Sequence, residues 1–249
     1  MHPPDIRDRA LTLIAEGIND CEISRRLGIP RSTVRDWRRP TYVPRVGARS
    51  SSTCPHCARR APQIVLSDAD YAELLGLYLG DGHITFMERT QRLRIALDAG
   101  HPRIVEEADA LLRRGFPENR VGRVLADNGH TVVLHVYSCH LSCLFPQAGP
   151  GKKHERRLEF PSWQRERITA APWSFLKGCI RSDGCVFINR TGPYEYLSYG
   201  FHNLSAEILG LFVETCRSLE LPPCVYATSV RLNRRDDVAR LLEHVGRKG

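Results

Sequence analysis

The feature that most constrains this chain is an internal repeat. Residues 71–84 align with residues 173–186 at an offset of 102 positions. Each copy reads as an apolar helix with a glycine in it, and ends at a small residue and Asp-Gly before strand-like sequence. The repeat predicts a duplicated α+β fold with two halves related by a pseudo-twofold axis.

Small residues spaced four apart on one face of each repeat helix predict how the two copies meet. They are Gly76 and Gly80 in the first copy, and Gly178 and Ser182 in the second. Such faces let two helices approach closely, which would place Asp81 and Asp183 side by side.

The repeated Asp-Gly carries the chemistry of the chain. We expect Gly82 and Gly184 to adopt the left-handed conformation that often follows a helix. A carboxylate at a helix C-terminus lies at the negative end of the helix dipole, which destabilises it, so Asp81 and Asp183 require a compensating cation. Two adjacent carboxylates share a proton or bind a divalent metal such as Mg²⁺.

Three short helices are predicted between Asp5 and Arg39, in a helix-turn-helix layout. Asp20 is a candidate cap of the second helix, and Gly28 supplies the turn before the third. The segment resembles the helix-turn-helix of invertase- and resolvase-type DNA-binding domains, with a protein-interaction module as the alternative. Five residues are expected to face outward for contact with DNA: Arg31, Ser32, Thr33, Arg35 and Arg38.

The charge distribution favours a polyanionic partner. The chain carries net +8, with +6 in residues 1–60, −3 in residues 61–150 and +5 in residues 151–249. Arginine supplies 32 of the 36 basic residues, which suits phosphate and guanine recognition, although codon bias in a GC-rich genome is an equally good cause of that ratio. A sequence pI near 9.2 favours nucleic acid.

A basic linker is expected over residues 41–66, and it contains Cys54 and Cys57 at the spacing of half a zinc site. The other close pair is Cys139 and Cys143. The spacing of Cys54 and Cys57 is compatible both with a zinc site and with free thiols. The odd cysteine count, the lack of an apolar run long enough for a membrane helix and the lack of a secretory leader predict a cytoplasmic, nucleoid-associated protein.

Residues 74–82 and 176–184 resemble the two motifs of the LAGLIDADG homing endonucleases, and the resemblance covers residues 67–249. It implies two αββαββα halves, about 67–160 and 161–249, after a helix-turn-helix domain over residues 1–40. It further implies that Asp81 and Asp183, with the neighbouring Gly80 and Ser182, hold catalytic Mg²⁺ or Mn²⁺ at the scissile phosphates.

Basic residues downstream of the first motif add candidates for DNA contact. Alternation is expected to put Arg92, Arg94, Arg120 and Arg123 on one sheet face, with an ordinary solvated face as the alternative. Family members place basic groups near the metals. A Gly-Pro-Gly turn followed by two lysines makes Lys152 a catalytic candidate, and neighbouring Lys153 a candidate for DNA contact.

The sequence therefore predicts a monomeric, site-specific endonuclease that hydrolyses phosphodiester bonds in double-stranded DNA. A non-cleaving transcription regulator on the same scaffold, as in bacterial sporulation regulators, is the second hypothesis. An intein endonuclease or RNA maturase is a third, but Leu204 follows His202-Asn203 where a splicing nucleophile would be needed.

Overall fold

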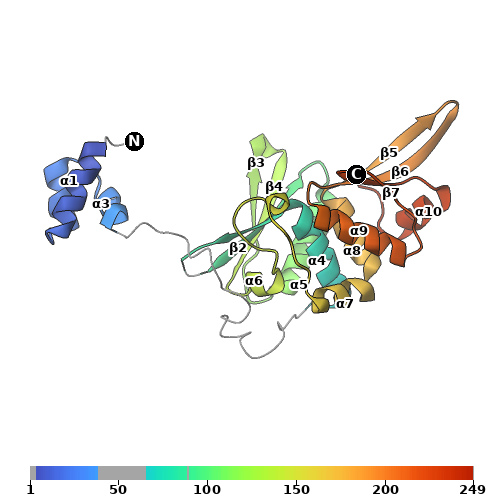
Figure 1. Ribbon diagram of the computed structural model, residues 1–249, viewed down its shortest axis with the longest axis horizontal. Coiled ribbons are helices and arrows are strands. Elements are labelled where there is room, and N and C mark those ends of the chain that lie inside the picture. Colours follow the sequence, from blue (N-terminus) through green and yellow to red (C-terminus); the bar gives the residue numbers. More distant parts are fainter. Residues whose placement is uncertain (1–3, 39–65, 89, 249) are drawn as a thin grey trace. The chain divides into compact units, whose positions relative to one another are not determined.

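The computed structural model describes residues 4–38, 66–88 and 90–248. The chain divides into two compact units, residues 1–47 and 48–249 (Figure 1). Most of the predicted linker falls outside the described residues. Within the described ranges, no helix has the length and apolar character required to cross a membrane.

The first unit is a three-helix module. Its helices are α1 (Pro4–Ala15), α2 (Asp20–Leu27) and α3 (Arg31–Arg38). Ile23, Ile29 and Val34 are buried at their meeting point, and Gly28 adopts the predicted left-handed conformation, with φ 64°. The expected cap was wrong by one residue, because Asn19 rather than Asp20 accepts the hydrogen bond from the Glu22 N–H.

The second unit contains two copies of one arrangement, each a helix, two strands, a helix, two further strands and a final helix. The first copy consists of α4 (Asp68–Asp81), β1 (Gly82–Phe86), β2 (Gln91–Asp98), α5 (Pro102–Gly115), β3 (Gly122–Ala126), β4 (Thr131–Ser138) and α6 (Leu141–Leu144). The second consists of α8 (Pro172–Arg181), β5 (Gly184–Thr191), β6 (Tyr194–His202), α9 (Ala206–Ser218), β7 (Cys224–Val225), β8 (Ser229–Leu232) and α10 (Arg235–His244). The remaining elements are the short helices η2 (Asp127–Gly129) and η3 (Lys153–Glu155), and α7 (Ser162–Ala170), which connects the copies.

The strand orders of the two antiparallel sheets correspond element by element. They are β1-β2-β4-β3 and β5-β6-β8-β7. One core of buried apolar residues runs through both copies, with α4 and α8 at the centre (Figure 1). The predicted α+β fold with duplicated halves is confirmed.

Helices α4 and α8 approach so closely that only glycine fits between them. A Cβ atom on Gly178 would lie 2.2 Å from the Glu73 carbonyl oxygen, and one on Gly76 would lie 2.7 Å from the Phe175 carbonyl oxygen and from the Cys179 nitrogen. The predicted packing through small residues is therefore correct.

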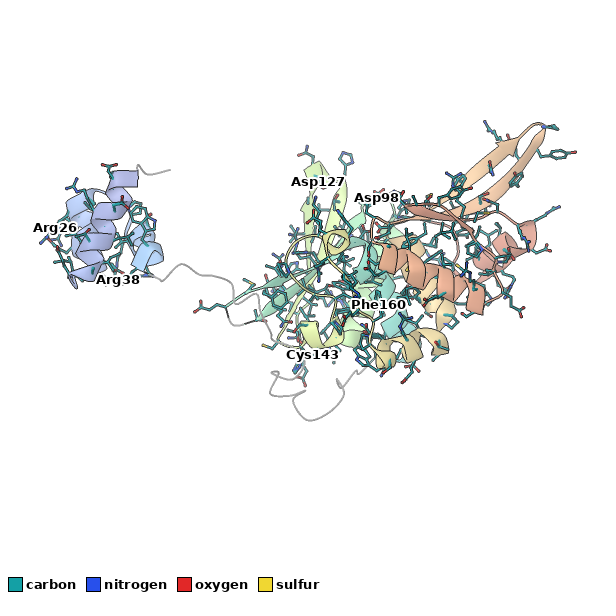
Figure 2. All side chains as sticks on the ribbon, viewed as in Figure 1. Arg26, Arg38, Asp98, Asp127, Cys143 and Phe160 are labelled. Atoms are coloured by element: carbon teal, nitrogen blue, oxygen red, sulfur yellow. The ribbon has the colours of Figure 1, made fainter. Side chains whose placement is uncertain are left out.

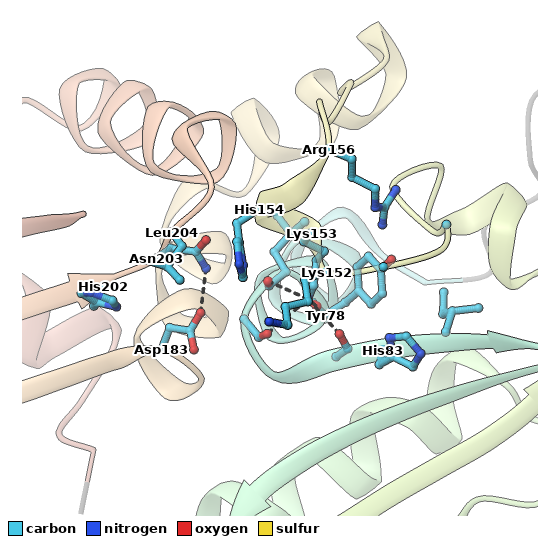
Figure 3. A pocket seen from close by; sticks show the side chains of 16 residues that line it. Tyr78, His83, Lys152, Lys153, His154, Arg156, Asp183, His202, Asn203 and Leu204 are labelled. Carbon is cyan, nitrogen blue, oxygen red and sulfur yellow. Dashed lines mark hydrogen bonds between the residues drawn. The ribbon is translucent and has the colours of Figure 1, made fainter. Parts of the chain in front are cut away.

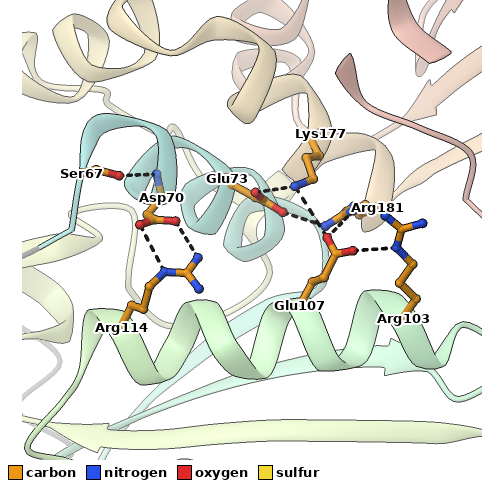
Figure 4. A network of polar contacts seen from close by, with 8 residues as sticks. All are labelled: Ser67, Asp70, Glu73, Arg103, Glu107, Arg114, Lys177 and Arg181. Carbon is orange, nitrogen blue, oxygen red and sulfur yellow. Dashed lines mark hydrogen bonds and ion pairs between the residues drawn. The ribbon is translucent and has the colours of Figure 1, made fainter. Parts of the chain in front are cut away.

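A network of ion pairs also joins the two repeat helices (Figure 4). The Glu73 carboxylate of α4 accepts hydrogen bonds from Lys177 at 3.0 Å and Arg181 at 2.8 Å, both on α8. Arg181 also pairs at 2.6 Å with Glu107 of α5, which in turn binds Arg103. The end of α8 is thereby tied to the first copy, two residues before Asp183.

The glycines of the two Asp-Gly pairs have a different role from the one predicted. Gly82 has φ −89° and ψ 147°, which is extended backbone, and Gly184 is not among the residues with positive φ. The left-handed expectation is wrong because each glycine begins a strand that leaves directly from its helix. A Cβ would lie 2.5 Å from the Tyr78 Cα at Gly82 and 2.4 Å from the Ile180 Cα at Gly184.

Candidate functional site

The two motif aspartates meet where α4 and α8 end. Asp81 is the last residue of α4, and Asp183 follows Ser182, the C-cap of α8. A Cβ on Gly80 would lie 2.2 Å from the Ser182 Oγ and 3.2 Å from the Asp183 Cγ. The contact between the small residues thus brings the two carboxylates into one site.

Electrostatics make this site unfavourable for negative charge unless a cation is present. Burial and the neighbouring Asp183 carboxylate raise the pKa of Asp81 to about 6. Burial also raises the pKa of Asp183, although a hydrogen bond of 2.7 Å from the Asn203 Nδ2 to its Oδ2 favours the ionised form.

The compensating cation for the first motif is Lys153. Its ammonium group donates to the carbonyl oxygens of Leu79 and Gly82 at 2.8 Å, of Gly80 at 3.2 Å and of Tyr78 at 2.5 Å (Figure 3). These oxygens form the negative end of α4, so the ammonium neutralises the helix dipole there. Burial lowers the pKa of Lys153 to about 8, while the Asp183 and Asp81 carboxylates oppose that shift.

Lys248 has the same role at the second motif. Its ammonium group donates to the carbonyl oxygens of Ser182 and of Gly184, the latter at 3.0 Å. These positions match Gly80 and Gly82 at the repeat offset. Each motif therefore has its own lysine, as the dipole argument required.

A cavity of about 560 Å³ opens beside Asp183. Its lining is strongly basic and includes Lys152, Lys153, His154 and Arg156 (Figure 3). Lys152, the predicted catalytic residue, lies at this cavity with an exposed side chain that pairs with Glu155 at 3.5 Å. Lys153, which was expected only to contact DNA, is the lysine that reaches the motif backbone.

Two of the predicted arginines share the face of the first sheet that points away from the core. Arg92 and Arg94 alternate along β2 with the buried Leu93 and Ile95. The Arg92 guanidinium lies 5.5 Å from the ring centre of Tyr137 on β4, its partner in the strand register. This face is therefore basic and aromatic.

Arg120 and Arg123 do not join that face as a pair. Arg120 is exposed just before β3, whereas Arg123 pairs with Glu106 of α5 at 2.5 Å. The expected single arginine face is wrong for Arg123, because its partner in the strand register is the buried Leu134 of β4, so Arg123 lies on the face of the sheet that the helices cover.

The predicted contact residues of the helix-turn-helix differ in availability. Arg31 and Arg35 are exposed and Thr33 is half-buried, whereas the side chain of Ser32 lies outside the described part. Arg38 (labelled in Figure 2) does not face outward as expected, because its guanidinium bonds the Asp20 carboxylate at 2.6 Å and the Ile18 carbonyl. Arg38 thus stabilises the module itself.

The predicted zinc pair, Cys54 and Cys57, lies outside the described residues. Within residues 4–38, 66–88 and 90–248, no group of three or more His, Cys, Asp or Glu side chains is arranged to hold a metal ion. The aspartate pair, with only two carboxylates, remains the candidate metal centre.

Two residues of the site were not predicted. They are Lys248, one of only four lysines in the chain, and Asn203. The offset of 102 does not extend to Asn203, because Gly82 pairs with Ile95 in the first copy whereas Gly184 pairs with Phe201 in the second, which shifts the second strands to an offset of 106. The offset gives no signal for Lys248 either, because the separation of Lys248 from Lys153 differs from it.

Comparisons with known proteins agree with both units. Residues 4–39 match the model of a homeodomain-like domain. Two solved structures of the homing endonuclease I-DmoI, one a set of mesophilic variants and one in complex with DNA and Mn, are each 16% identical with a TM-score of 0.51. They cover 72% of this chain and 96% and 97% of their own.

A third structure, full-length DUF199/WhiA from Thermatoga maritima, is 16% identical with a TM-score of 0.46, over 72% of this chain and 55% of that one. No curated protein matches the sequence. The chain thus combines a homeodomain-like helix-turn-helix with the fold of the LAGLIDADG homing endonucleases.

Proposed function

We propose that this protein is a site-specific DNA endonuclease that depends on a divalent metal. The observation that carries the proposal is the meeting of Asp81 and Asp183 at the ends of two packed helices, each end neutralised by its own lysine. A duplicated fold with no catalytic role would have no need for a repelling carboxylate at both equivalent positions.

The donors of this site fit a hard divalent cation. Asp81 and Asp183 offer carboxylate oxygens, and Mg²⁺ is commonly held by one or two carboxylates together with water and substrate phosphates. The carbonyls of Gly80 and Ser182 are engaged by lysine ammonium groups, so we assign the metal to the carboxylates. When bound, Mg²⁺ or Mn²⁺ would activate water and stabilise the leaving oxygen of a phosphodiester.

The side chains around the carboxylates would bind and orient the phosphate. The ammonium groups of Lys153 and Lys248 are held in place by backbone carbonyls, so they present positive charge without reorganising as negative charge develops. Lys152 and Arg156 line the cavity beside Asp183 and would attract the DNA backbone.

The DNA-reading surfaces would be the helix-turn-helix and the basic sheet face. Arg31 and Arg35 are exposed on α3, the helix that enters the major groove in such modules. Arg92 and Arg94 give the first sheet a basic face. The DNA and Mn named for the I-DmoI complex are consistent with these partners. Because one chain supplies both halves, we propose that it acts as a monomer.

The test is selection of bound duplexes from a random library, followed by a cleavage assay on the selected site with Mg²⁺ and Mn²⁺. Cleavage is expected for the wild type, whereas Asp81→Asn and Asp183→Asn should bind the site without cutting it. Asp236→Asn, which removes an exposed carboxylate elsewhere, is the matched control and should cut normally. Specific binding by the wild type without cleavage in either metal would refute the endonuclease and favour the regulator.

A further inference from the structure

Lys153 reaches the end of α4 from a loop that has no large apolar side chain to hold it in place. This loop, residues 148–155, is called the lysine loop below. Between residues 150 and 157 every residue is exposed except Lys153 and Arg156. We propose that Arg156 is a positioning residue, which closes the lysine loop and thereby fixes the Lys153 ammonium group at the end of α4. The expected effect on cleavage rests on the proposed endonuclease function.

Arg156 joins the two ends of the lysine loop. Its Nη2 donates a hydrogen bond to the carbonyl oxygen of Gln147, the residue just before the loop. The guanidinium group also packs on Gly149, where a Cβ atom would lie 2.7 Å from the Arg156 Nη1. A hydrogen bond from a charged donor is stronger than one between neutral groups. One side chain therefore ties the residue after the loop to the beginning of the loop.

The beginning of the loop is itself fixed by a buried polar network. Gln147 is 2% exposed, and its Nε2 donates to the Oε1 of Gln164 at 2.6 Å and to the carbonyl oxygen of Glu159 at 2.7 Å. Gln164 of α7 donates in turn to the hydroxyl of Tyr71 on α4 at 2.7 Å. The Gln147 carbonyl is thus a fixed acceptor. Closing the loop onto it also fixes the loop relative to α4.

Tyr78 of α4 contacts both basic side chains (Figure 3). The Lys153 Nζ lies 4.9 Å from the centre of the Tyr78 ring and donates to the Tyr78 carbonyl oxygen. Burial raises the pKa of the Tyr78 hydroxyl, and a hydrogen bond that Arg156 donates to this hydroxyl opposes the shift. Arg156 and Lys153 are therefore both held against the same buried residue.

Arg156 does not hold Lys153 by direct attraction, because both side chains are cationic. Burial lowers the pKa of Lys153, and the charge of Arg156 lowers it further, which is the sign expected for repulsion between like charges. The contacts inside the loop, between Lys152 and Glu155, are local and exposed, so they do not tie the loop to α4. Arg156 must therefore act on Lys153 through the backbone of the loop.

The size of the effect follows from the hydrogen bond to Gln147. The net contribution of a hydrogen bond with a charged partner corresponds to a factor of about 10–100 in an equilibrium. Without the guanidinium group, we expect the fraction of molecules in which Lys153 has left the end of α4 to rise by about that factor. The Lys153 amine then becomes accessible to a reagent in solution.

The first experiment measures acetylation of the full-length protein by a low dose of an N-hydroxysuccinimide ester of acetate, read by mass spectrometry. Only four lysines are present, Lys152, Lys153, Lys177 and Lys248. Lys152 is exposed and is the internal reference, whereas Lys177, paired with Glu73 between the repeat helices, reports the intact fold. Lys153 should react much more slowly than Lys152 in the wild type. In Arg156→Met the ratio of their rates should rise about tenfold or more.

Two further variants separate the position of the guanidinium group from its charge. Arg157→Met removes the same charge from the neighbouring exposed residue and should leave the ratio unchanged. Gly149→Ala keeps every charge but adds a methyl group where the guanidinium group packs, so it should raise the ratio. An unchanged ratio in Arg156→Met with Lys177 still protected would overturn the inference. If Arg156→Met exposes Lys177 as well, the ratio in Gly149→Ala decides.

Cleavage of the selected site with Mg²⁺ distinguishes positioning from a purely structural role. At saturating protein, Arg156→Met and Lys153→Met should each lower the rate. The double variant should be no slower than Lys153→Met, because Arg156 acts through Lys153. Losses that multiply in the double variant would overturn the inference. If the wild type binds the site without cutting it, the endonuclease proposal fails, and the acetylation ratio alone decides whether Arg156 positions Lys153.

Discussion

Substitution of Gly178 by Ala tests the contact that brings the two motifs together. The added methyl group would lie 2.2 Å from the Glu73 carbonyl oxygen and 3.0 Å from the Gly76 Cα. Both atoms belong to the backbone of α4, so no side-chain rotation can relieve the overlap. The two helices must separate by about 1 Å to restore ordinary contact distances.

The loss of stability in Gly178→Ala can be worked out from the packing of the two helices. Overpacking a close-packed core costs about 1–3 kcal/mol or more, and a backbone clash at the centre of the unit belongs at the upper end. Alanine gains about 1 kcal/mol over glycine in a helix, so the net loss for Gly178→Ala is about 2 kcal/mol. For a unit of this size that corresponds to a fall in Tm of about 4–8 °C.

Gly210→Ala is the matched control. Gly210 lies inside α9, and a Cβ there would meet no atom within 4 Å. The same methyl group and the same helix propensity are added without a clash, so this variant should gain about 0.5–1 kcal/mol in stability. The difference between the two variants isolates the cost of separating α4 from α8.

Thermal unfolding followed by circular dichroism, with EDTA present, measures both variants. The unit that carries the repeat should unfold at a lower temperature in Gly178→Ala and at an equal or higher temperature in Gly210→Ala. If Gly178→Ala unfolds within 1 °C of the wild type, the close approach of the two helices is wrong, and with it the adjacency of the aspartates.

Three further predictions concern charge. Asp81→Asn should raise the free energy of unfolding in EDTA at pH 8 by about 3 kcal/mol. The folded pKa of Asp81 is raised from 3.8 to about 6, so the carboxyl group gives the wild type a stability that is full below pH 4 and lost as the pH rises through 6. Equal gains at pH 4 and pH 8 in urea titrations would contradict this. Glu73→Gln should lower the free energy of unfolding by about 2 kcal/mol in the same urea titration, because it removes the partly buried ion pairs with Lys177 and Arg181. An unchanged urea midpoint would argue against the network of ion pairs. Arg35→Ala should weaken DNA binding and lower the salt slope of log K by about 0.9, whereas an unchanged slope would mean that this guanidinium contacts no phosphate.

Much of the fold was predictable because the repeat and the periodicity are local signals. The apolar spacing located both motif helices, and the positions of Gly76 and Gly178 predicted their contact. The network around Glu73 was not predictable, because its partners come from helices more than 100 residues apart along the chain.

The candidate site was predicted only in part, because only some of its features depend on local sequence signals. The requirement for a cation near each aspartate came from the helix dipole, but Lys153 and Lys248 were identified only by the fold. Two lysines adjoin the Gly-Pro-Gly turn, and backbone conformation alone decides which of them reaches the end of α4.

The sequence by itself determined the duplication, the pairing of Asp81 with Asp183 and the helix-turn-helix, because these depend on residue type and spacing within short segments. Only the tertiary structure decided that Gly82 serves close packing rather than a left-handed turn, and that Asn203 supports one carboxylate without an equivalent at the other. The physical reason is that a repeat preserves the backbone path, whereas each half-site is completed by side chains from distant loops that did not remain equivalent.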